Sequence, residues 1–213
     1  MKIYAMYNPD DSNYSGTIQL NEIQPADGSG LTDILPSKAM LKALNERSVK
    51  KLLFDQANKK WQPVKFTDDD FKQAIATAKA IINAEVRDKL NEPFLYGGAI
   101  FSMENTKQFE YYDFLLLCVF EMEKFPVKFA TSSGTSIEFK SLDDVKKFFS
   151  SLVKWKKEIK TIGRIVKNGG EINQIQFLPL KGKAMNELMP EAIKQLINHA
   201  FALWEESKSD VEA

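Results

Sequence analysis

Few side chains in this sequence could build a catalytic site that depends on histidine or cysteine. There is one histidine, His199, and one cysteine, Cys118. A Ser-His-Asp triad, a Cys-His dyad or a zinc site with several histidines would have to use His199, which excludes most common hydrolase designs. We expect His199 to be a surface or boundary residue. We expect Cys118, within the apolar run 114–120, to be a core residue whose thiol pKa is raised by burial, and we predict no catalytic residue.

Carboxylates are plentiful, and a pair of them can perform acid–base catalysis where burial separates their pKa values. The clusters in this chain lie at expected helix starts, namely Asp68, Asp69 and Asp70, and then Asp143 and Asp144. Negative charge is stabilising there without any catalytic role. The run 10–13, Asp-Asp-Ser-Asn, resembles part of a calcium loop but lacks the glycine and the distant glutamate of the full pattern. We therefore predict no metal site and no cofactor.

Two glycine pairs and one lysine-rich segment could contact phosphate groups. Gly97-Gly98 and Gly169-Gly170 are not followed by Lys-Ser or Lys-Thr and belong to no GxGxxG sequence, so both favour turns. The segment 154–160 could bind phosphates with a base stacked on Trp155, but a solvated helix face is the favoured alternative. Because 29 basic residues balance 29 acidic ones, no overall field attracts nucleic acid, and we predict no nucleic-acid partner.

Composition predicts a folded protein that is neither secreted nor inserted in a membrane. An apolar content of 44% over 213 residues is enough to bury a core. No run approaches about 18 apolar residues, and the first residues lack a signal-peptide pattern, so we predict neither membrane insertion nor secretion. A single cysteine allows no intramolecular disulfide.

The first third of the chain alternates short apolar segments with turn formers. Strands are expected at 2–7 and 17–20, and a short helix at 37–46. Strands at 51–55 and 61–66 are expected to form a hairpin around a five-residue loop, with Phe54 and Trp61 packed on one face.

Helical periodicity is strongest in the middle of the chain. Thr67 is expected to cap a helix over about 68–90, and Ser141 a second one over 142–166. A further helix, at about 104–124, is apolar almost all round, which predicts that it is covered on most sides. The remaining expected elements are tight hairpins at 94–101 and 127–139, a strand at 172–178 and a last helix at 190–206.

These elements predict an α+β fold in which short antiparallel strands and hairpins accompany three to four main helices. We expect three regions. Residues 1–66 form a small β-rich region, residues 67–168 an α+β core domain, and residues 169–213 a C-terminal strand and helix packed on that core.

Two stretches resemble proteins of bacteriophage tails. Leu35-Pro36, followed by the segments 51–55 and 58–64 with Phe54-Asp55 and Trp61, resembles the N-terminal part of tail-fibre and tail-fibre-assembly proteins. The segment from Arg87 to about Lys160 resembles a family of unknown function that is often encoded among tail genes. Its matching features are Pro93-Phe94, Tyr96-Gly97-Gly98, Phe101, Gln108-Phe109, Phe125-Pro126-Val127, Phe129-Ala130-Thr131 and the helix entry between Phe139 and Phe149. Together the two stretches span roughly two thirds of the chain.

The resemblance implies a role and supplies no catalytic residue or cofactor. It implies a non-enzymatic structural or tail-fibre-assembly protein that contacts a tail fibre or baseplate component, in the host cytoplasm during assembly or in the virion tail. Two alternatives stay open: a phage or prophage binding module that inhibits a host protein, and an enzyme with a carboxylate or backbone-only site. A homo-oligomer is compatible with each of these functions.

We expect the partner to bind the irregular N-terminal third or the C-terminal extension. Residues 71–166 carry the strongest periodicity, so their apolar side chains should be buried in the core. The segments 7–35 and 178–189 are rich in loop formers and carry four apolar side chains that we expect to be exposed and to contact a partner, namely Tyr14, Leu31, Met185 and Met189.

Overall fold

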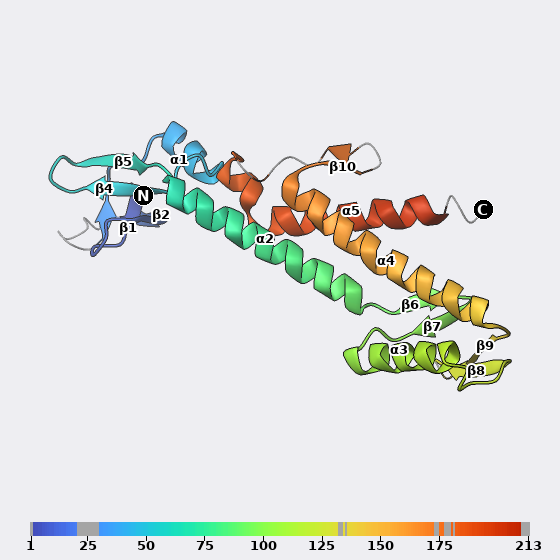
Figure 1. Cartoon of the computed structure of the whole chain (residues 1–213). Coiled ribbons are helices and arrows are strands. Elements are labelled where there is room, and N and C mark those ends of the chain that lie inside the picture. Colours follow the sequence, from blue (N-terminus) through green and yellow to red (C-terminus); the bar gives the residue numbers. More distant parts are fainter. Residues whose placement is uncertain are drawn as a thin grey trace. The chain divides into compact units, whose positions relative to one another are not determined.

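The protein is an α+β protein, as the sequence predicts, with helices and short antiparallel strand pairs in separate stretches of chain (Figure 1). The computed structural model describes residues 2–20, 30–131, 134, 136–172, 175–176, 180 and 182–209. The structure contains the first strand, both central hairpins and the three longest helices that the sequence predicts.

The chain forms two compact units. The first comprises Met1–Ala78 and Lys181–Ala192, and the second Lys79–Leu180 and Ile193–Ala213. The boundary thus falls inside a continuous helix, whereas the sequence placed it just before that helix. Within the first unit Lys50 Nζ lies 2.7 Å from Asp70 Oδ1, so an ion pair ties the first turn of the helix to the preceding chain. The expected division at residues 66 and 168 stays a prediction.

The first unit consists of small sheets with one short helix and the beginning of a long one. A three-stranded antiparallel sheet has the order β2-β1-β3, and β4 pairs with β5. The strand β3 was not predicted, and the β4–β5 turn is one residue shorter than expected. The elements are β1 (Lys2–Tyr7), β2 (Tyr14–Leu20), β3 (Leu31–Thr32), α1 (Lys38–Asn45), β4 (Lys51–Asp55), β5 (Lys60–Val64), the first turns of α2 (Asp68–Asn91) and the 3₁₀ helix η1 (Met185–Leu188).

An aromatic cluster holds the first unit together. Phe54 and Trp61 are paired across β4 and β5 with ring centroids 5.0 Å apart, which confirms the expected contact. Tyr7 from β1 packs against both rings, and Trp61 Nε1 donates a hydrogen bond of 2.6 Å to the carbonyl oxygen of Ile34. The buried indole of Trp61, with its N–H satisfied, adds a large apolar area to the core of this small sheet.

The second unit joins hairpins to long helices. Each of its strand pairs is antiparallel, and each is a two-stranded sheet. The elements are the remainder of α2, β6 (Phe94–Tyr96), β7 (Ala99–Phe101), α3 (Asn105–Val119), β8 (Val127–Ala130), β9 (Ser136–Phe139), α4 (Leu142–Asn168), β10 (Glu171–Ile172), β11 (Ile175–Gln176) and α5 (Pro190–Ser209).

The expected strand at 172–178 is wrong as a single element. Ile172 and Ile175 instead fall in two short strands, β10 and β11, which pair with each other. Asn173, a turn former, separates them in the sequence, and two intervening residues suit a hairpin. Residues 173–174 and 177–178 of the expected strand lie outside the described residues.

Helix α4 is the longest element of the second unit and begins where the sequence predicts. Ser141 Oγ accepts a hydrogen bond of 3.3 Å from the backbone N–H of Asp144, so the expected cap is confirmed. One face of the helix is buried along its length, and that face contains Val145, Phe148, Phe149, Leu152, Ile159, Ile162, Gly163 and Val166.

The core of the second unit is largely aromatic. Phe148 of α4 is 1% exposed, and its ring centroid lies 4.6 Å from that of Phe101 and 6.3 Å from that of Tyr111. Farther along α4, Gly163 faces α2. A Cβ atom added at Gly163 would lie 2.3 Å from Cγ2 of Val86, so the glycine permits a close approach of the two helices.

Candidate functional site

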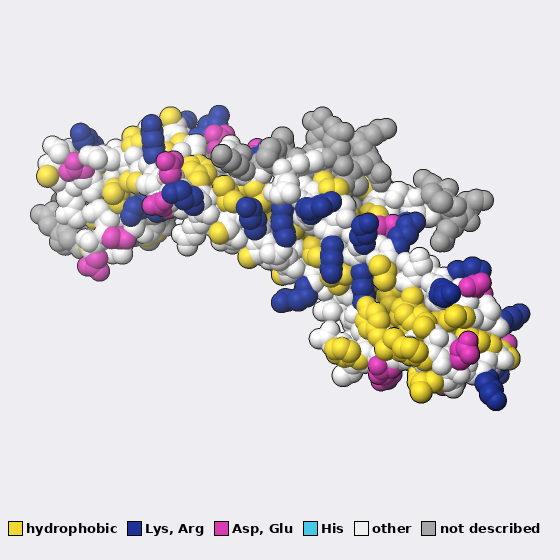
Figure 2. Space-filling model, viewed as in Figure 1, with side chains coloured by type: hydrophobic (Ala, Val, Ile, Leu, Met, Phe, Trp, Pro, Cys, Tyr) yellow, Lys and Arg dark blue, Asp and Glu magenta, His cyan; other side chains and the backbone are white. Residues whose placement is uncertain are grey.

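Helix α3 exposes an apolar surface. Its exposed large apolar side chains, or those just beyond its end, include Phe109 and Phe120, both 69% exposed, and Met122, 72% exposed. Leu116 is half exposed, and Tyr112, Leu117 and Val119 are also classed as exposed. Figure 2 shows a yellow patch over α3 and the adjoining part of α4. Single exposed apolar residues are common on proteins, but a contiguous group of them marks an interaction surface.

The exposure follows from helical geometry. Phe109, Tyr112, Leu116 and Phe120 follow one another at intervals of 3, 4 and 4 residues, so they share one side of α3. Another side, which carries Tyr111, Phe114 and Cys118, is buried in the aromatic core. The expectation that this helix is covered on most sides is therefore wrong, because the core of the unit uses only one of its apolar sides.

The end of α3 displays two of these side chains. Phe120 is the C-cap, and Glu121 adopts a left-handed conformation with φ of 57°. The backbone N–H of Met122 donates to the carbonyl of Leu117 at 2.9 Å, and that of Glu121 to the carbonyl of Cys118 at 3.3 Å. These two bonds form a Schellman motif, which stops the helix before the expected end at 124. Phe120 and Met122 therefore project from a fixed turn.

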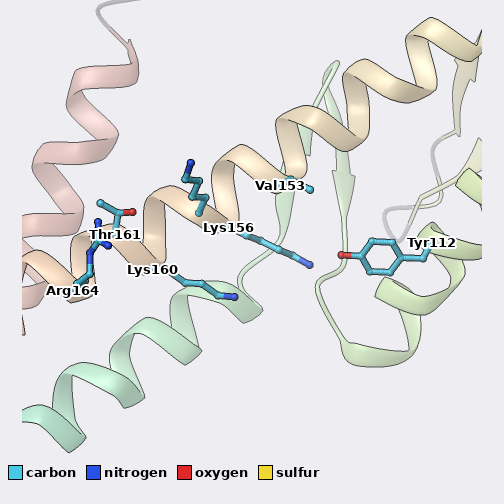
Figure 3. A pocket seen from close by; sticks show the side chains of 7 residues that line it. Tyr112, Val153, Lys156, Lys160, Thr161 and Arg164 are labelled. Atoms are coloured by element: carbon cyan, nitrogen blue, oxygen red, sulfur yellow. The ribbon is translucent and has the colours of Figure 1, made fainter.

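A basic groove lies beside the apolar surface. It has a volume of about 550 Å³ and is lined by Tyr112, Val153, Lys156, Lys157, Lys160, Thr161 and Arg164. In Figure 3, Tyr112 projects from α3 toward Lys156 on α4, and Lys160 and Arg164 follow along the same helix. Intervals of 3 and 4 residues place these α4 side chains on one face. Tyr112 and Val153, both exposed, belong to the groove and to the apolar patch.

The groove contains four cationic side chains and no acidic one among its lining residues. Lys156 Nζ hydrogen-bonds to Oε1 of Gln108 and lies 5.9 Å from the centroid of the Tyr112 ring. Burial, and then repulsion by Lys160, lowers the pKa of Lys156. Within the described part of the chain, Lys157, Lys160 and Arg164 form no ion pair. An anionic group in the groove would therefore meet charges that have no competing partner.

A second groove in the same unit, of about 980 Å³, has a different electrostatic character. Its carboxylates are paired with cations: Lys89 Nζ lies 2.6 Å from Glu92 Oε2 and 2.5 Å from Glu205 Oε1. Glu158 accepts a hydrogen bond of 3.2 Å from Trp204 Nε1 and lies 3.3 Å from Lys208 Nζ. Such neutralised carboxylates cross-link α2, α4 and α5, and the network is typical of structural ion pairs.

The four residues predicted to contact a partner all belong to the first unit. Each is partly buried, so their expected exposure is wrong. Tyr14 packs edge-on against Trp61 at 5.4 Å, and Leu31 lies in β3, opposite Met6 of β1. Met185 begins η1, and Met189 follows it directly. Their role in partner binding stays a prediction. Residues 21–29, 178–179 and 181 of the two predicted segments lie outside the described residues.

Neither Cys118 nor His199 is among the residues that line the two grooves. Cys118 is buried, and burial followed by the charge of Glu123 raises its thiol pKa, as expected for an inert core residue. His199 is exposed on α5. Trp155 packs against Phe94 at 5.4 Å on the core side of α4, so it does not offer its ring beside Lys156 and Lys160 for base stacking. In the described chain, no group of three or more potential metal ligands lies together.

The sequence pattern of α3 does not reveal its exposed surface, because a helix that is apolar almost all round predicts burial. A helix that is apolar on every side is either enclosed by its own chain or reserved for another molecule, and periodicity alone does not separate the two. The basic groove did have a signal in the segment 154–160, but Trp155 belongs to the core and the cations continue to Arg164.

No helix in the described chain is both long enough and apolar enough to cross a bilayer. Comparison of the chain with protein-family models, with curated proteins and with solved structures finds no match in any of the three.

Proposed function

We propose that this chain is a non-enzymatic, tail-associated structural or tail-fibre-assembly protein of a bacteriophage, and that it acts through protein–protein contacts. The observation that carries the contact role is the exposed apolar side of α3, with Phe109, Leu116 and Phe120 at its centre. Aromatic side chains are enriched at the centres of protein interfaces, where a few of them supply most of the binding energy.

The proposed partner is a tail fibre or baseplate component. This part of the proposal rests on the resemblance of residues 35–64 and 87–160 to phage tail proteins, and it places the protein in the host cytoplasm during assembly or in the virion tail. An assembly protein of this kind needs an adhesive surface that stays accessible until the partner covers it. The exposure of Phe120 and Met122 on a fixed turn meets that need.

The test is co-purification from phage-infected cells with a variant matched to the wild type. The variant carries Phe109→Ser, Leu116→Ser and Phe120→Ser, which remove exposed side chains and leave the buried Tyr111, Phe114 and Cys118 in place. The control carries Leu95→Ser, because Leu95 is 67% exposed in the same unit but lies in the other groove. Circular dichroism establishes that each variant is folded.

We expect the wild type and the Leu95→Ser control to travel with virions or with unassembled fibres, and the triple variant to be lost from both. A folded triple variant that travels with fibres as the wild type does would contradict the contact role of α3. A stable complex with a host protein instead of tail components would contradict the assembly role and favour a host-protein inhibitor. If the purified chain is a dimer or larger oligomer and the triple variant is a monomer, the α3 surface binds a second copy and not a fibre.

A further inference from the structure

We propose that the exposed apolar side of α3 and the basic groove beside it, together the α3–α4 surface, bind an amphipathic helix of the partner. This helix carries acidic side chains along the edge of its apolar face that lies over α4. The proposal deepens the contact role proposed above and rests on it. It names the chemistry of the partner segment: apolar residues against α3, and carboxylates against Lys156, Lys157, Lys160 and Arg164.

Charge complementarity determines the acidic edge. The groove presents four cations at helical spacing, and none of its lining residues is acidic. The ammonium group of Lys156 is partly buried and lies next to Lys160. Both the burial and the repulsion by Lys160 disfavour its charged form. Carboxylates of a partner would relieve that repulsion and would form charge-assisted hydrogen bonds with the remaining lysines and the arginine.

The other edge of the α3 surface has the opposite polarity. At 100° per residue, Asp113 falls on the side of the apolar stripe away from Tyr112, the residue that meets α4. The acidic edge of a bound helix must therefore lie on the α4 side. This requirement determines the direction in which the helix binds as well as the composition of its two edges. A helix with acidic residues on both edges would bring a carboxylate toward Asp113.

The apolar area has the dimensions of one helix. Helix α3 contains 15 residues, so it is about 22 Å long. A partner helix of about 15 to 18 residues covers that length, with anchors on one face at i, i+4, i+7 and i+11 that lie over Phe109, Leu116 and Phe120. The packing of α4 beside α3 supports this geometry, because the two helices run antiparallel along the same surface. Gln108 meets Lys156, while Tyr112 packs at 6.0 Å against Phe149.

Nucleic acid and an anionic membrane fit the surface less well. Phosphates would pair with the lysines, but they would leave Phe109, Leu116 and Phe120 without an apolar counterpart, and the Trp155 ring is packed against the core. A membrane surface is broad and nearly flat, whereas the cations lie in a concave groove of about 550 Å³. A single helix reaches both the groove and the apolar side of α3.

The experiment uses the full chain and two synthetic helical peptides of about 18 residues. Both peptides carry Leu and Phe at helical spacing and Gln on one edge. The first carries Glu on the other edge, and the second carries Lys in place of each Glu. Dissociation constants are measured by fluorescence anisotropy at low and at physiological salt.

The matching protein variants alter the groove without altering the core. One carries Lys157→Gln, Lys160→Gln and Arg164→Gln. The wild-type side chains at these positions lie on the groove face of α4 and form no ion pair with a described residue. The control carries Lys140→Gln, Lys146→Gln and Lys147→Gln, which remove the same charge elsewhere in the unit. The triple serine variant of α3 completes the set.

We expect the wild type to bind the acidic peptide at least tenfold more tightly than the basic one. We expect the groove variant to lose about tenfold in affinity, since each exposed ion pair contributes a small factor, and the control to change less than twofold. Raising the salt should weaken wild-type binding and have less effect on the groove variant.

Equal affinity for the two peptides, or unchanged binding by the groove variant, would overturn the inference. It would also be overturned if the chain binds vesicles containing phosphatidylserine or a single-stranded oligonucleotide through the same cations while it ignores the acidic peptide. If the α3 variant loses tail components but the groove variant keeps them, the acidic edge is wrong and the proposed contact function stands. If neither variant loses tail components, the proposed function itself fails.

Discussion

The close approach of α4 to α2 predicts that Gly163→Ala destabilises the second unit. Alanine is normally the better helix former, by about 1 kcal/mol, so at an open helical position the substitution would be stabilising. At Gly163 the added Cβ would lie 2.3 Å from Cγ2 of Val86, well inside the carbon–carbon contact distance of about 3.5 Å. Val86 is β-branched and its side chain has little rotamer freedom in a helix, so relief requires movement of the helices.

The two contributions can be compared. Overpacking in a helix interface costs about 1 to 3 kcal/mol, which outweighs the gain in helix propensity at all but the bottom of that range. We therefore expect the free energy of unfolding of Gly163→Ala to fall by up to about 2 kcal/mol. The double variant Gly163→Ala, Val86→Ala removes the clashing methyl group, so the two substitutions should be less than additive by about 1 kcal/mol.

Chemical denaturation of the wild type, both single variants and the double variant measures this coupling. A stabilised Gly163→Ala protein, or strict additivity in the double variant, would refute the close packing of α4 on α2. The result bears on function because Gly163 lies between Thr161 and Arg164, and the packing of α4 holds the groove residues in place.

Substitutions at three further positions test single contacts. Trp61→Ala should lower the free energy of unfolding by about 3 kcal/mol or more. Trp61→Phe should lower it by about 1 kcal/mol, because the hydrogen bond to the carbonyl oxygen of Ile34 is lost. Unchanged denaturation midpoints would mean that the indole is exposed. Glu121→Gly should stabilise the protein by a few tenths of a kcal/mol up to about 1 kcal/mol by relieving the left-handed conformation, whereas a loss in a thermal melt would show that the side chain matters more than φ. Hydrogen bonds from Lys50 and Thr67 lower the pKa of Asp70 from 3.8 to about 2. The ionised carboxylate therefore stabilises the folded state above pH 4, and this contribution is lost as the pH falls toward 2. The difference in denaturation midpoint between wild type and Asp70→Asn should therefore shrink over that range, and a constant difference would contradict the shift.

Local structure with a short-range cause could be predicted from the sequence. Caps at Thr67 and Ser141 and the glycine turn at Gly97-Gly98 depend on side chains and backbone freedom within a few residues. The Phe54–Trp61 contact is also local, because a hairpin register brings the two residues together. These features do not require knowledge of how distant segments pack.

Features set by tertiary packing could not be predicted. The composition of α3 gave no way to decide which of its apolar sides the chain itself would cover, and only the aromatic core around Phe148 settles it. Tyr14 illustrates the converse error: its loop-like surroundings favoured exposure, but Trp61 in β5 of another hairpin provides an aromatic partner. The basic groove likewise needs both α3 and α4, since Tyr112 and Gln108 come from one and Lys156 from the other.

Site-specific photo-cross-linking tests the central claim most directly. A photoreactive phenylalanine derivative is placed at Phe109 or Phe120 on α3, at Tyr14 or Met185 in the first unit, and at Leu95 as an exposed control. Each protein is irradiated with purified tail fibres, and the cross-linked product is identified by mass spectrometry. We predict cross-links from Phe109 and Phe120 and none from Leu95. Cross-links from Tyr14 and Met185, with none from α3, would contradict the account and place the partner on the first unit.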